Sequence, residues 1–479
     1  MSGRHVTFDC SWHLPISSSS TLRRTVLKAQ STVTNGQLIE ALKEARARTL
    51  ELVNDLNDEQ LMGPRLKIVN PLRWEIGHIA WFQEFWVLRH LGSQPPILKQ
   101  GDELYDSARV AHDTRWDMPL LERDKTLAYL ERVLERVIEQ ASSEGPNLRD
   151  AEGYDQEYFL NLVLLHEQMH DEAVAYTRQT LSYSAPTLGI TNEVRVAEHN
   201  DALGQTSDDL TRDAQIPGGK FILGSTNEEG FVFDNERVAH DVEIAPFAVS
   251  KTAVSNGQFR NFVEDNGYKR SELWTEEGWH WRTAVSAEHP VYWRREGRDW
   301  LRRNFDECVA LDDRLPVIHI NWHEANAYCR WAGRRLPREA EWEMAASAEP
   351  SANGQGLLEQ KRRYPWGEGL PTIERANLDF SVMGCIPVDA LAAGDSAFGC
   401  RQMIGNVWEW TASDFNPYPG FVAGPYKEYS EPWFGDHKVL RGGCWVTRSR
   451  LIHNSYRNFY TPDRRDVWAG FRTCALQEQ

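Results

Sequence analysis

The sequence lacks paired cysteines, an excess of positive charge and any long apolar run. Its seven cysteines are scattered without a C-x-x-C pair, so they indicate neither a disulfide framework nor a thiolate zinc site. Lys and Arg number 53 against 70 Asp and Glu, and the resulting net charge of −17 repels the phosphate backbone of nucleic acids. No stretch is apolar and long enough to span a membrane, and the first 30 residues contain no signal-peptide core. We therefore expect a cytoplasmic protein that binds neither nucleic acid nor membrane.

Tryptophan is the residue type that the sequence has in excess. The 479 residues contain 19 tryptophans, many of them in the second half. Such a density is typical of a loop-rich domain held together by large side chains, or of a pocket that binds an organic cation. The length of the chain predicts two compact domains.

Apolar residues recur at helical spacing in the first part of the chain. After residues 1–33, which we expect to form a flexible lead-in, start signals at Thr34 and Pro71 open two amphipathic segments. Two further helices are predicted at about residues 119–140 and 155–181. Four helices of this length predict a bundle, a scaffold in which inward side chains on facing helices bind metals.

The pattern changes after residues 185–212, a polar stretch that we interpret as a linker between a bundle at 34–184 and a second domain at 213–479. In the second domain, short β-like runs such as 220–223 and 242–244 alternate with loops rich in Gly, Pro and Trp. Helices followed by short strands predict the α+β class.

The segment HEQMHDE at residues 166–172 is the clearest candidate for a site. A helix presents His166 and His170, four residues apart, on one face, where both imidazoles can bind one metal ion. His78, on the second predicted helix, is the candidate third ligand, and Glu172 is interpreted as a hydrogen-bond acceptor beside the ligands. A three-histidine face suits non-haem Fe(II) or catalytic zinc. Solvated histidines, or a buried His78 with an ordinary hydrogen-bond partner, are the alternatives.

Several motifs resemble a two-domain family, the ergothioneine sulfoxide synthases. In the bundle these are the stretch NPLRWEIGHIAWF at residues 70–82 and the later histidine pair with its acid. The second part resembles the formylglycine-generating enzymes, or sulfatase-modifying factors, through the motifs RLPREAEWE (335–343), YPWG (364–367), GNVWEWT (405–411), LRGG (440–443) and AGFR (469–472). The resemblance implies a DinB-like four-helix bundle followed by a loop-rich, C-type-lectin-like domain.

The same resemblance implies an activity. In this family Fe(II) is held by three histidines, which here are His78, His166 and His170. The substrates are O₂ and hercynine (Nα-trimethylhistidine), whose imidazole binds the iron while a new bond forms at ring carbon C2. A tyrosine supplies a proton or an electron, and the resemblance points to Tyr426 or Tyr429.

The loop RNFYTPDRR at residues 457–465 resembles the segment that binds both substrates of these enzymes. The resemblance implies that Asn458 contacts hercynine and that Phe459 faces its quaternary ammonium group, a cation that aromatic faces bind well. It also implies that Arg464 or Arg465 holds the carboxylate of the donor through a bidentate fork.

Four positions depart from the family pattern. Tyr460 replaces an Asp of the enzymes that use γ-glutamylcysteine, Met169 replaces a Gln, and Ala108 and Arg109 stand where cysteine-using relatives have two tyrosines. We interpret these departures as a rebuilt donor pocket beside unchanged metal ligands. The sequence from Met169 to Leu181 is similar to that of the selenoneine synthase branch, which joins a selenosugar to hercynine.

The sequence is also compatible with other functions. The first is formation of ergothioneine sulfoxide with cysteine or γ-glutamylcysteine as the thiol donor. A formylglycine-generating enzyme needs two cysteines shortly after the LRGG motif, where this chain has Thr447 and Ile452. A non-catalytic, lectin-like binding module would bind no iron. A zinc hydrolase would need Glu167 or Glu172 as its general base.

Overall fold

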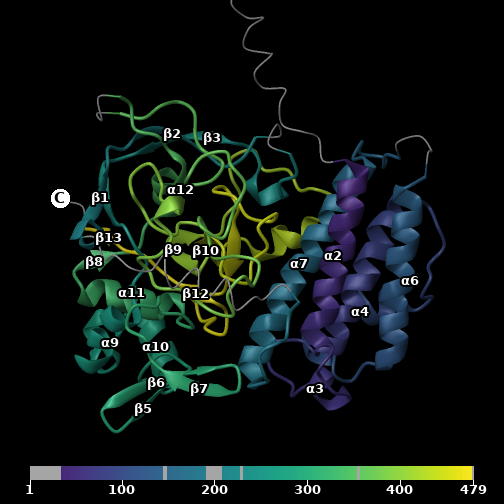
Figure 1. The fold of residues 1–479 in the computed structure, drawn as a ribbon, viewed down its shortest axis with the longest axis horizontal. Coiled ribbons are helices and arrows are strands. Elements are labelled where there is room, and N and C mark those ends of the chain that lie inside the picture. Colours follow the sequence, from purple (N-terminus) through teal and green to yellow (C-terminus); the bar gives the residue numbers. More distant parts are fainter. Residues whose placement is uncertain (1–33, 144–147, 190–207, 227–229, 353–355, 477–479) are drawn as a thin grey trace, which may run out of the picture.

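The protein is described by a computed structural model at residues 34–143, 148–189, 208–226, 230–352 and 356–476. A helical domain and a domain of short strands and long loops lie side by side (Figure 1). The predicted lead-in at 1–33 and most of the predicted linker fall outside the described residues. Within the described ranges, none of the helices has the length and apolar character to cross a membrane.

Four long helices form the first domain, as the periodicity predicts: α2 (Asn35–Val53), α4 (Leu72–Gln83), α6 (Arg123–Ala141) and α7 (Gln156–Leu181). The short helices α3 (Asp58–Met62) and α5 (Gly101–Tyr105) lie in the connections. Capping explains two of the helix starts, because the side chains of Thr34 and Asp155 each accept a hydrogen bond from a backbone N–H of the first turn.

Helix α4 is buried on nearly all sides and lies between other helices of the bundle. It continues directly into η1 (Glu84–Leu91), a π-helix, where the spacing of apolar residues predicts an uninterrupted α-helix. At its end the Gly92 N–H donates to the Val87 carbonyl, five residues earlier, at 3.0 Å. Short π-helical segments are rare and frequently lie near functional sites.

The second domain contains, in its described residues, four small sheets. Two have the strand orders β1-β4-β13-β8 and β11-β10-β9-β12, while β2 pairs with β3 and β6 pairs with both β5 and β7. The strands are β1 (Asp213–Ile216), β2 (Gly219–Leu223), β3 (His240–Ile244), β4 (Phe247–Ser250), β5 (Trp293–Glu296), β6 (Asp299–Asn304), β7 (Glu307–Ala310), β8 (Arg334–Arg335), β9 (Trp408–Asp414), β10 (Lys438–Arg441), β11 (Asn458–Tyr460), β12 (Ala469–Gly470) and β13 (Cys474–Ala475). Its longer helices are α9 (Asn256–Glu264), α10 (Glu276–Ala284), α11 (Trp322–Trp331) and α12 (Glu339–Ser347).

Buried tryptophans and ion pairs stabilise this domain, which has little regular structure. Arg472 donates to both carboxylate oxygens of Glu409, at 2.6 and 2.8 Å, and both side chains of this pair are buried. Five tryptophans are each less than 2% exposed: Trp342, Trp408, Trp410, Trp445 and Trp468. The tryptophan excess therefore fills the core of a loop-rich domain.

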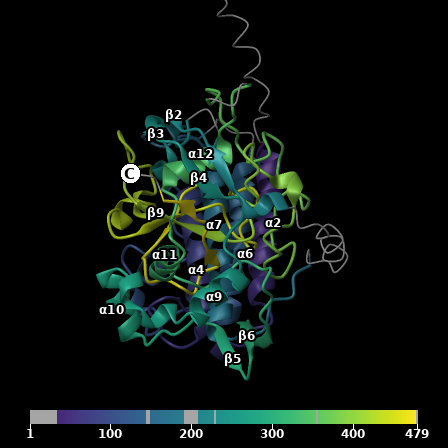
Figure 2. The ribbon, with the colours of Figure 1, turned by 90° about the vertical axis from the view of Figure 1, so that its left-hand side faces the viewer.

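Helix α7 lies against the second domain, and Figure 2 shows the loops of that domain in front of the bundle. The buried carboxylate of Glu172 accepts hydrogen bonds from Trp408 Nε1 at 2.6 Å and from Thr447 Oγ1 at 2.8 Å. On α2, Glu44 accepts a hydrogen bond from Arg448 at 2.6 Å. Glu172, which the sequence suggests as a partner of the metal ligands, instead joins the two domains.

Candidate metal centre

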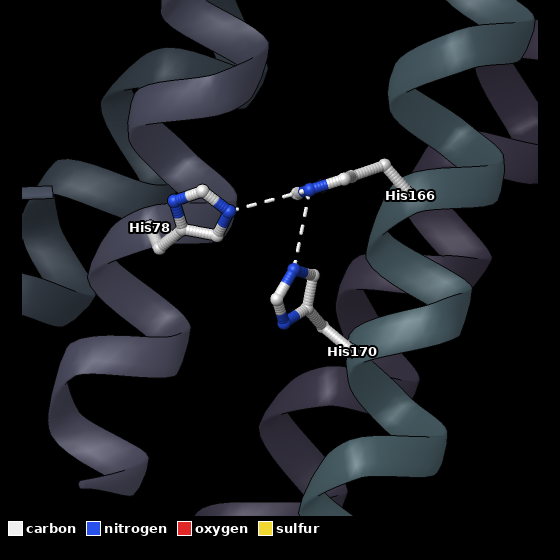
Figure 3. A group of neighbouring side chains, drawn as sticks. All are labelled: His78, His166 and His170. Atoms are coloured by element: carbon white, nitrogen blue, oxygen red, sulfur yellow. Dashed lines mark hydrogen bonds between the residues drawn. The ribbon is translucent and has the colours of Figure 1, made fainter. Parts of the chain in front are cut away.

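Three histidines converge inside the bundle (Figure 3). His78 extends from α4, and His166 and His170 extend from successive turns of α7. The Nε2 atom of His166 lies 3.3 Å from His78 Nε2 and 3.2 Å from His170 Nε2. One potential ligand atom from each residue lies within 4.8 Å of the others. The structure thus brings together the three histidines that the sequence singles out.

The far side of two of the rings is held by hydrogen bonds. His78 Nδ1 donates to the carbonyl oxygen of Tyr105 at 2.7 Å, and His170 Nδ1 donates to Glu75 Oε2. The Tyr105 ring lies so close to Gly77 that a side chain there would overlap it. Because Nδ1 carries the proton in both histidines, the Nε2 lone pairs are directed at the shared centre.

Burial and the neighbouring histidines keep His78 and His166 neutral. Burial, followed by the nearby His170, lowers the pKa of His78 to about 3, and burial lowers the pKa of His166 well below its usual value. Burial by itself raises the pKa of Glu75, but the charge of His170 and hydrogen bonds from His170 and Asn70 outweigh it and bring this pKa to about 2. His78 and His166 are therefore neutral imidazoles, and the carboxylate of Glu75 behind the site is ionised.

These residues fit a divalent transition metal. Several nitrogen lone pairs that face one another repel each other, and the single proton that His166 Nε2 could carry satisfies only one neighbour. A cation bound by all three lone pairs removes that repulsion. Three imidazoles leave coordination positions for substrates, which suits Fe(II) and also catalytic zinc.

The acids beside the histidines on α7 are engaged elsewhere. Glu167, completely buried, accepts hydrogen bonds from Arg46 and Gln83, each at 2.7 Å, and from Thr49 at 2.9 Å. Glu172 contacts the second domain as described above. Neither carboxylate is free to act as the general base that a zinc hydrolase needs.

Tyr426 is the second-domain tyrosine that lies against the histidines. Its ring centre is 5.8 Å from that of His166, edge to face, and 4.8 Å from that of Phe82. Among the described residues its hydroxyl has no hydrogen-bond partner, and burial raises its pKa. Its hydroxyl therefore stays protonated at neutral pH.

Tyr429 packs on Tyr426, with ring centres 6.0 Å apart. Its hydroxyl shares a 3.0 Å hydrogen bond with the hydroxyl of Tyr456, which in turn lies 3.5 Å from Met169 Sδ. Its ring centre is 5.5 Å from that of Phe459. Met169 thus contacts the second domain through Tyr456.

The predicted substrate loop begins as β11, an edge strand paired only with β10 in its sheet. The side-chain oxygen of Asn458 accepts a hydrogen bond from the backbone N–H of Phe459 at 2.8 Å. Phe459 stacks on Phe415 with ring centres 4.0 Å apart. Tyr460 is half-buried, and burial raises its pKa well above the usual value.

The two arginines of this loop have different surroundings. Arg464 forms a bidentate ion pair with Asp466, at 2.7 and 2.8 Å, and lies over the rings of Tyr176 and Tyr460. Arg465 lies over the ring of Trp281, with 5.2 Å between the guanidinium carbon and the ring centre. Asp466 therefore already occupies the guanidinium fork of Arg464, which would otherwise be able to hold the carboxylate of a donor.

Among the described residues, no contact of the Arg109 side chain connects it to the histidines. It pairs with Asp106 at 3.1 Å, and its side chain is 67% exposed. Sequence reasoning also passed over Glu75, which accepts the hydrogen bond from His170. The available signal was its spacing, since a carboxylate three residues before His78 lies on the same face of the helix.

Comparison with known proteins gives matches to both domains. Residues 41–174 match the DinB superfamily, and residues 200–476 match the sulfatase-modifying factor enzyme 1-like domain. A "Hercynine oxygenase" of Mycobacterium tuberculosis is 36% identical, over 91% of this chain and 98% of its own length. The "Hercynine oxygenase" of Mycolicibacterium smegmatis is 33% identical, over 91% of this chain and 97% of its own length. A "Formylglycine-generating enzyme" of Thermomonospora curvata is 32% identical but matches only 54% of this chain, and 92% of its own length.

Fold and comparisons together define a two-domain oxidoreductase, a DinB-type bundle joined to a sulfatase-modifying-factor domain. The chain belongs to the same family as the hercynine oxygenases, which match both of its domains almost from end to end. The formylglycine-generating enzymes match the second domain alone.

Proposed function

We propose that this enzyme uses Fe(II) and O₂ to form a carbon–selenium bond between C2 of the hercynine imidazole and a selenosugar, as a selenoneine synthase does. The alternative is a carbon–sulfur bond to cysteine or γ-glutamylcysteine, as in ergothioneine sulfoxide synthesis. The observation that carries the proposal is the convergence of three histidines next to a tyrosine of the second domain. The likeness to hercynine oxygenases over 91% of the chain supports hercynine as the acceptor.

The electron balance of this reaction requires O₂. Formation of the bond between ring carbon C2 and the chalcogen, with loss of one hydrogen from each partner, releases two protons and two electrons. Reduction of O₂ to water takes up four electrons. Oxidation of the new chalcogen ether to its oxide supplies the other two. Fe(II) bound by His78, His166 and His170 would supply the electron transfer to O₂ that the side chains themselves cannot provide.

The side chains around the histidines have separate tasks in this proposal. Tyr426, protonated and without a hydrogen-bond partner among the described residues, donates a proton toward the reacting centre. Phe459 and its neighbours present aromatic faces to the trimethylammonium group, and Asn458 orients hercynine. Tight packing of Trp74 on His78, with ring centres 4.7 Å apart, keeps water from that ligand.

The surroundings of the residues proposed to bind the chalcogen donor favour a sugar over an amino acid as that donor. Asp466 occupies the fork of Arg464, so that side chain is not available for a donor carboxylate. Tyr176 and Tyr460 flank the same guanidinium. Aromatic rings and hydroxyls of this kind bind the faces and hydroxyls of a sugar ring, whereas an amino-acid donor would call for an acid at position 460. A lectin-like module without catalysis is a further alternative, and it gives no account of the three converging histidines.

The proposal is tested by anaerobic reconstitution with Fe(II), followed by reaction in air with hercynine and one donor at a time. The donors are the selenosugar, cysteine and γ-glutamylcysteine, and products are identified by mass spectrometry. We expect a hercynine–selenium product only with the selenosugar, and none from the matched His170→Ala variant. A sulfoxide formed from a thiol donor would replace the selenium assignment with the alternative. Absence of any hercynine product with every donor would rule out both.

A further inference from the structure

One buried carboxylate connects a candidate ligand to the other helix of the site. Glu75 is 2% exposed and lies on α4, opposite α7. Its Oε2 accepts the hydrogen bond from His170 Nδ1, and its Oε1 accepts one from Asn70 Nδ2 at 2.5 Å. Both oxygens of the carboxylate are therefore used, one on the ligand and one on a residue that holds the carboxylate in place.

The chain of contacts continues beyond Asn70. Arg115 Nη1 donates to Asn70 Oδ1 at 2.7 Å, so the amide has a fixed orientation with its NH₂ toward Glu75. The Arg115 guanidinium lies on the Trp74 ring, with 3.7 Å from its carbon to the ring centre. Trp74 is in turn stacked on His78, at 4.7 Å and an interplanar angle of 10°. The contacts thus form a continuous path from His170 to His78 around the outside of the site.

We infer that Glu75 is a positioning residue, which fixes the ring orientation and tautomer of His170 and is itself fixed by Asn70 and Arg115. A histidine that donates its Nδ1–H to a carboxylate presents a more basic Nε2 in a fixed direction. A neutral residue in its place removes a negative charge near the metal and accepts at most a weaker hydrogen bond from the ring. Metal affinity and the reduction potential of bound iron are then set partly by Glu75, which binds no metal itself. This inference rests on the proposed metal site.

The test compares Glu75→Gln, which keeps the volume, with the wild-type enzyme. We expect affinity for Co(II), measured by competition with a metal-chelating dye, to fall roughly 10- to 100-fold. The reduction potential of the Fe(II)-loaded protein should rise, because a charge that stabilises Fe(III) is lost. Asn70→Ala, one contact further out, should give a smaller change of the same sign, and it serves as the measurement if Glu75→Gln does not fold.

Glu84→Gln is the matched control. Glu84 is also completely buried on the continuation of α4, but it accepts its hydrogen bond from Tyr129 at 2.7 Å and not from a histidine. It should leave Co(II) affinity and potential unchanged. Wild-type values in Glu75→Gln, or an equal loss in Glu84→Gln, would overturn the inference while leaving the metal site intact. A wild-type protein that binds no Co(II) would instead contradict the proposed function.

Discussion

At the scale of single residues, the two tyrosines that the sequence could not rank have different surroundings. Tyr426 packs edge to face on His166, and its hydroxyl has no partner among the described residues. The hydroxyl of Tyr429 is bound to that of Tyr456. An acid that must deliver a proton is best placed where its hydroxyl is not already committed, so Tyr426 is the better candidate.

We expect Tyr426→Phe to lower the rate of product formation roughly 10²- to 10⁴-fold, the usual contribution of a general acid. Metal content should stay unchanged, because Phe keeps the packing on His166. Tyr429→Phe should act mainly on stability, by about 1 kcal/mol for the lost hydrogen bond. Single-turnover product yield and thermal unfolding of both variants provide the measurement. A larger loss of turnover in Tyr429→Phe would exchange the two roles.

At the scale of elements, α12 presents two glutamates to Arg441 on β10 and to Arg457 just before β11. Glu339 and Glu343 lie one turn apart. Glu339 pairs with Arg457 at 2.7 Å, and Glu343 pairs with Arg441 and, at 2.8 Å, with Lys361. Helix, strand β10 and the segment leading to β11 are thereby connected through buried charges.

The Glu343 pair predicts a pH-dependent stability. Burial raises the pKa of Glu343, but Lys361 and Arg441 outweigh burial and hold it below its usual value of 4.5. Its stabilising effect is complete above that value and is lost as the pH falls through the lower pKa of the folded state. Glu343→Gln should cost roughly 3–5 kcal/mol near pH 7, the usual cost of breaking a buried pair. Urea unfolding at a series of pH values measures this difference.

The deficit of Glu343→Gln should stay constant down to about pH 4.5 and shrink at lower pH, where the wild-type carboxylate is protonated as well. Glu40→Gln is the control, because Glu40 is 72% exposed in its pair with Lys43 and such pairs contribute little. A deficit that is independent of pH would contradict the assignment of charge to Glu343.

The sequence predicts the long helices of the bundle well, but it predicts neither the π-helix η1 nor the strands β5 to β7. Helices α2, α6 and α7 lie within a few residues of their expected positions, because apolar spacing and capping residues are local signals. The π-helix η1 escaped prediction, since a single extra residue per turn barely alters that spacing. Strands β5 to β7 also have no clear signal in a sequence so rich in charged residues.

The candidate site also contains residues that the sequence predicts and residues that it does not. Spacing alone pairs His166 with His170, but the role of Glu75 depends on which helix packs opposite α7. Arg464 illustrates the reverse case, because its partner Asp466 is only two residues away. Whether those two side chains turn toward each other or toward a substrate is decided by tertiary packing, which short-range pattern does not encode.

At the scale of the whole molecule, both helices that carry histidines belong to the bundle, while Tyr426 belongs to the second domain. A metal bound by the three histidines therefore ties α4 to α7. A ligand that binds only the folded state stabilises it by about 2.7 kcal/mol when its free concentration is 100 times its Kd. Metal removal should accordingly destabilise the bundle first.

We expect a chelator to lower the Tm of the reconstituted protein, and added Co(II) to restore it. His166→Ala should abolish this response, because it removes the ligand between the other two. His289→Ala, which changes a histidine of the second domain, should respond as the wild type does. Differential scanning calorimetry measures the shift. An unchanged Tm on chelation, or a response retained in His166→Ala, would count against the metal site.

Helix α7 has one more consequence for anyone who wishes to redesign this enzyme. His170 and Glu172 are two residues apart and so point to different sides of the helix, one to the histidine cluster and one to Trp408 and Thr447. The contact with the second domain fixes the rotation of α7 about its axis. It thereby also fixes the direction in which the histidines point. A chimaera that grafts another donor-binding domain onto this bundle must therefore retain Trp408 and Thr447, or the ligands lose their alignment.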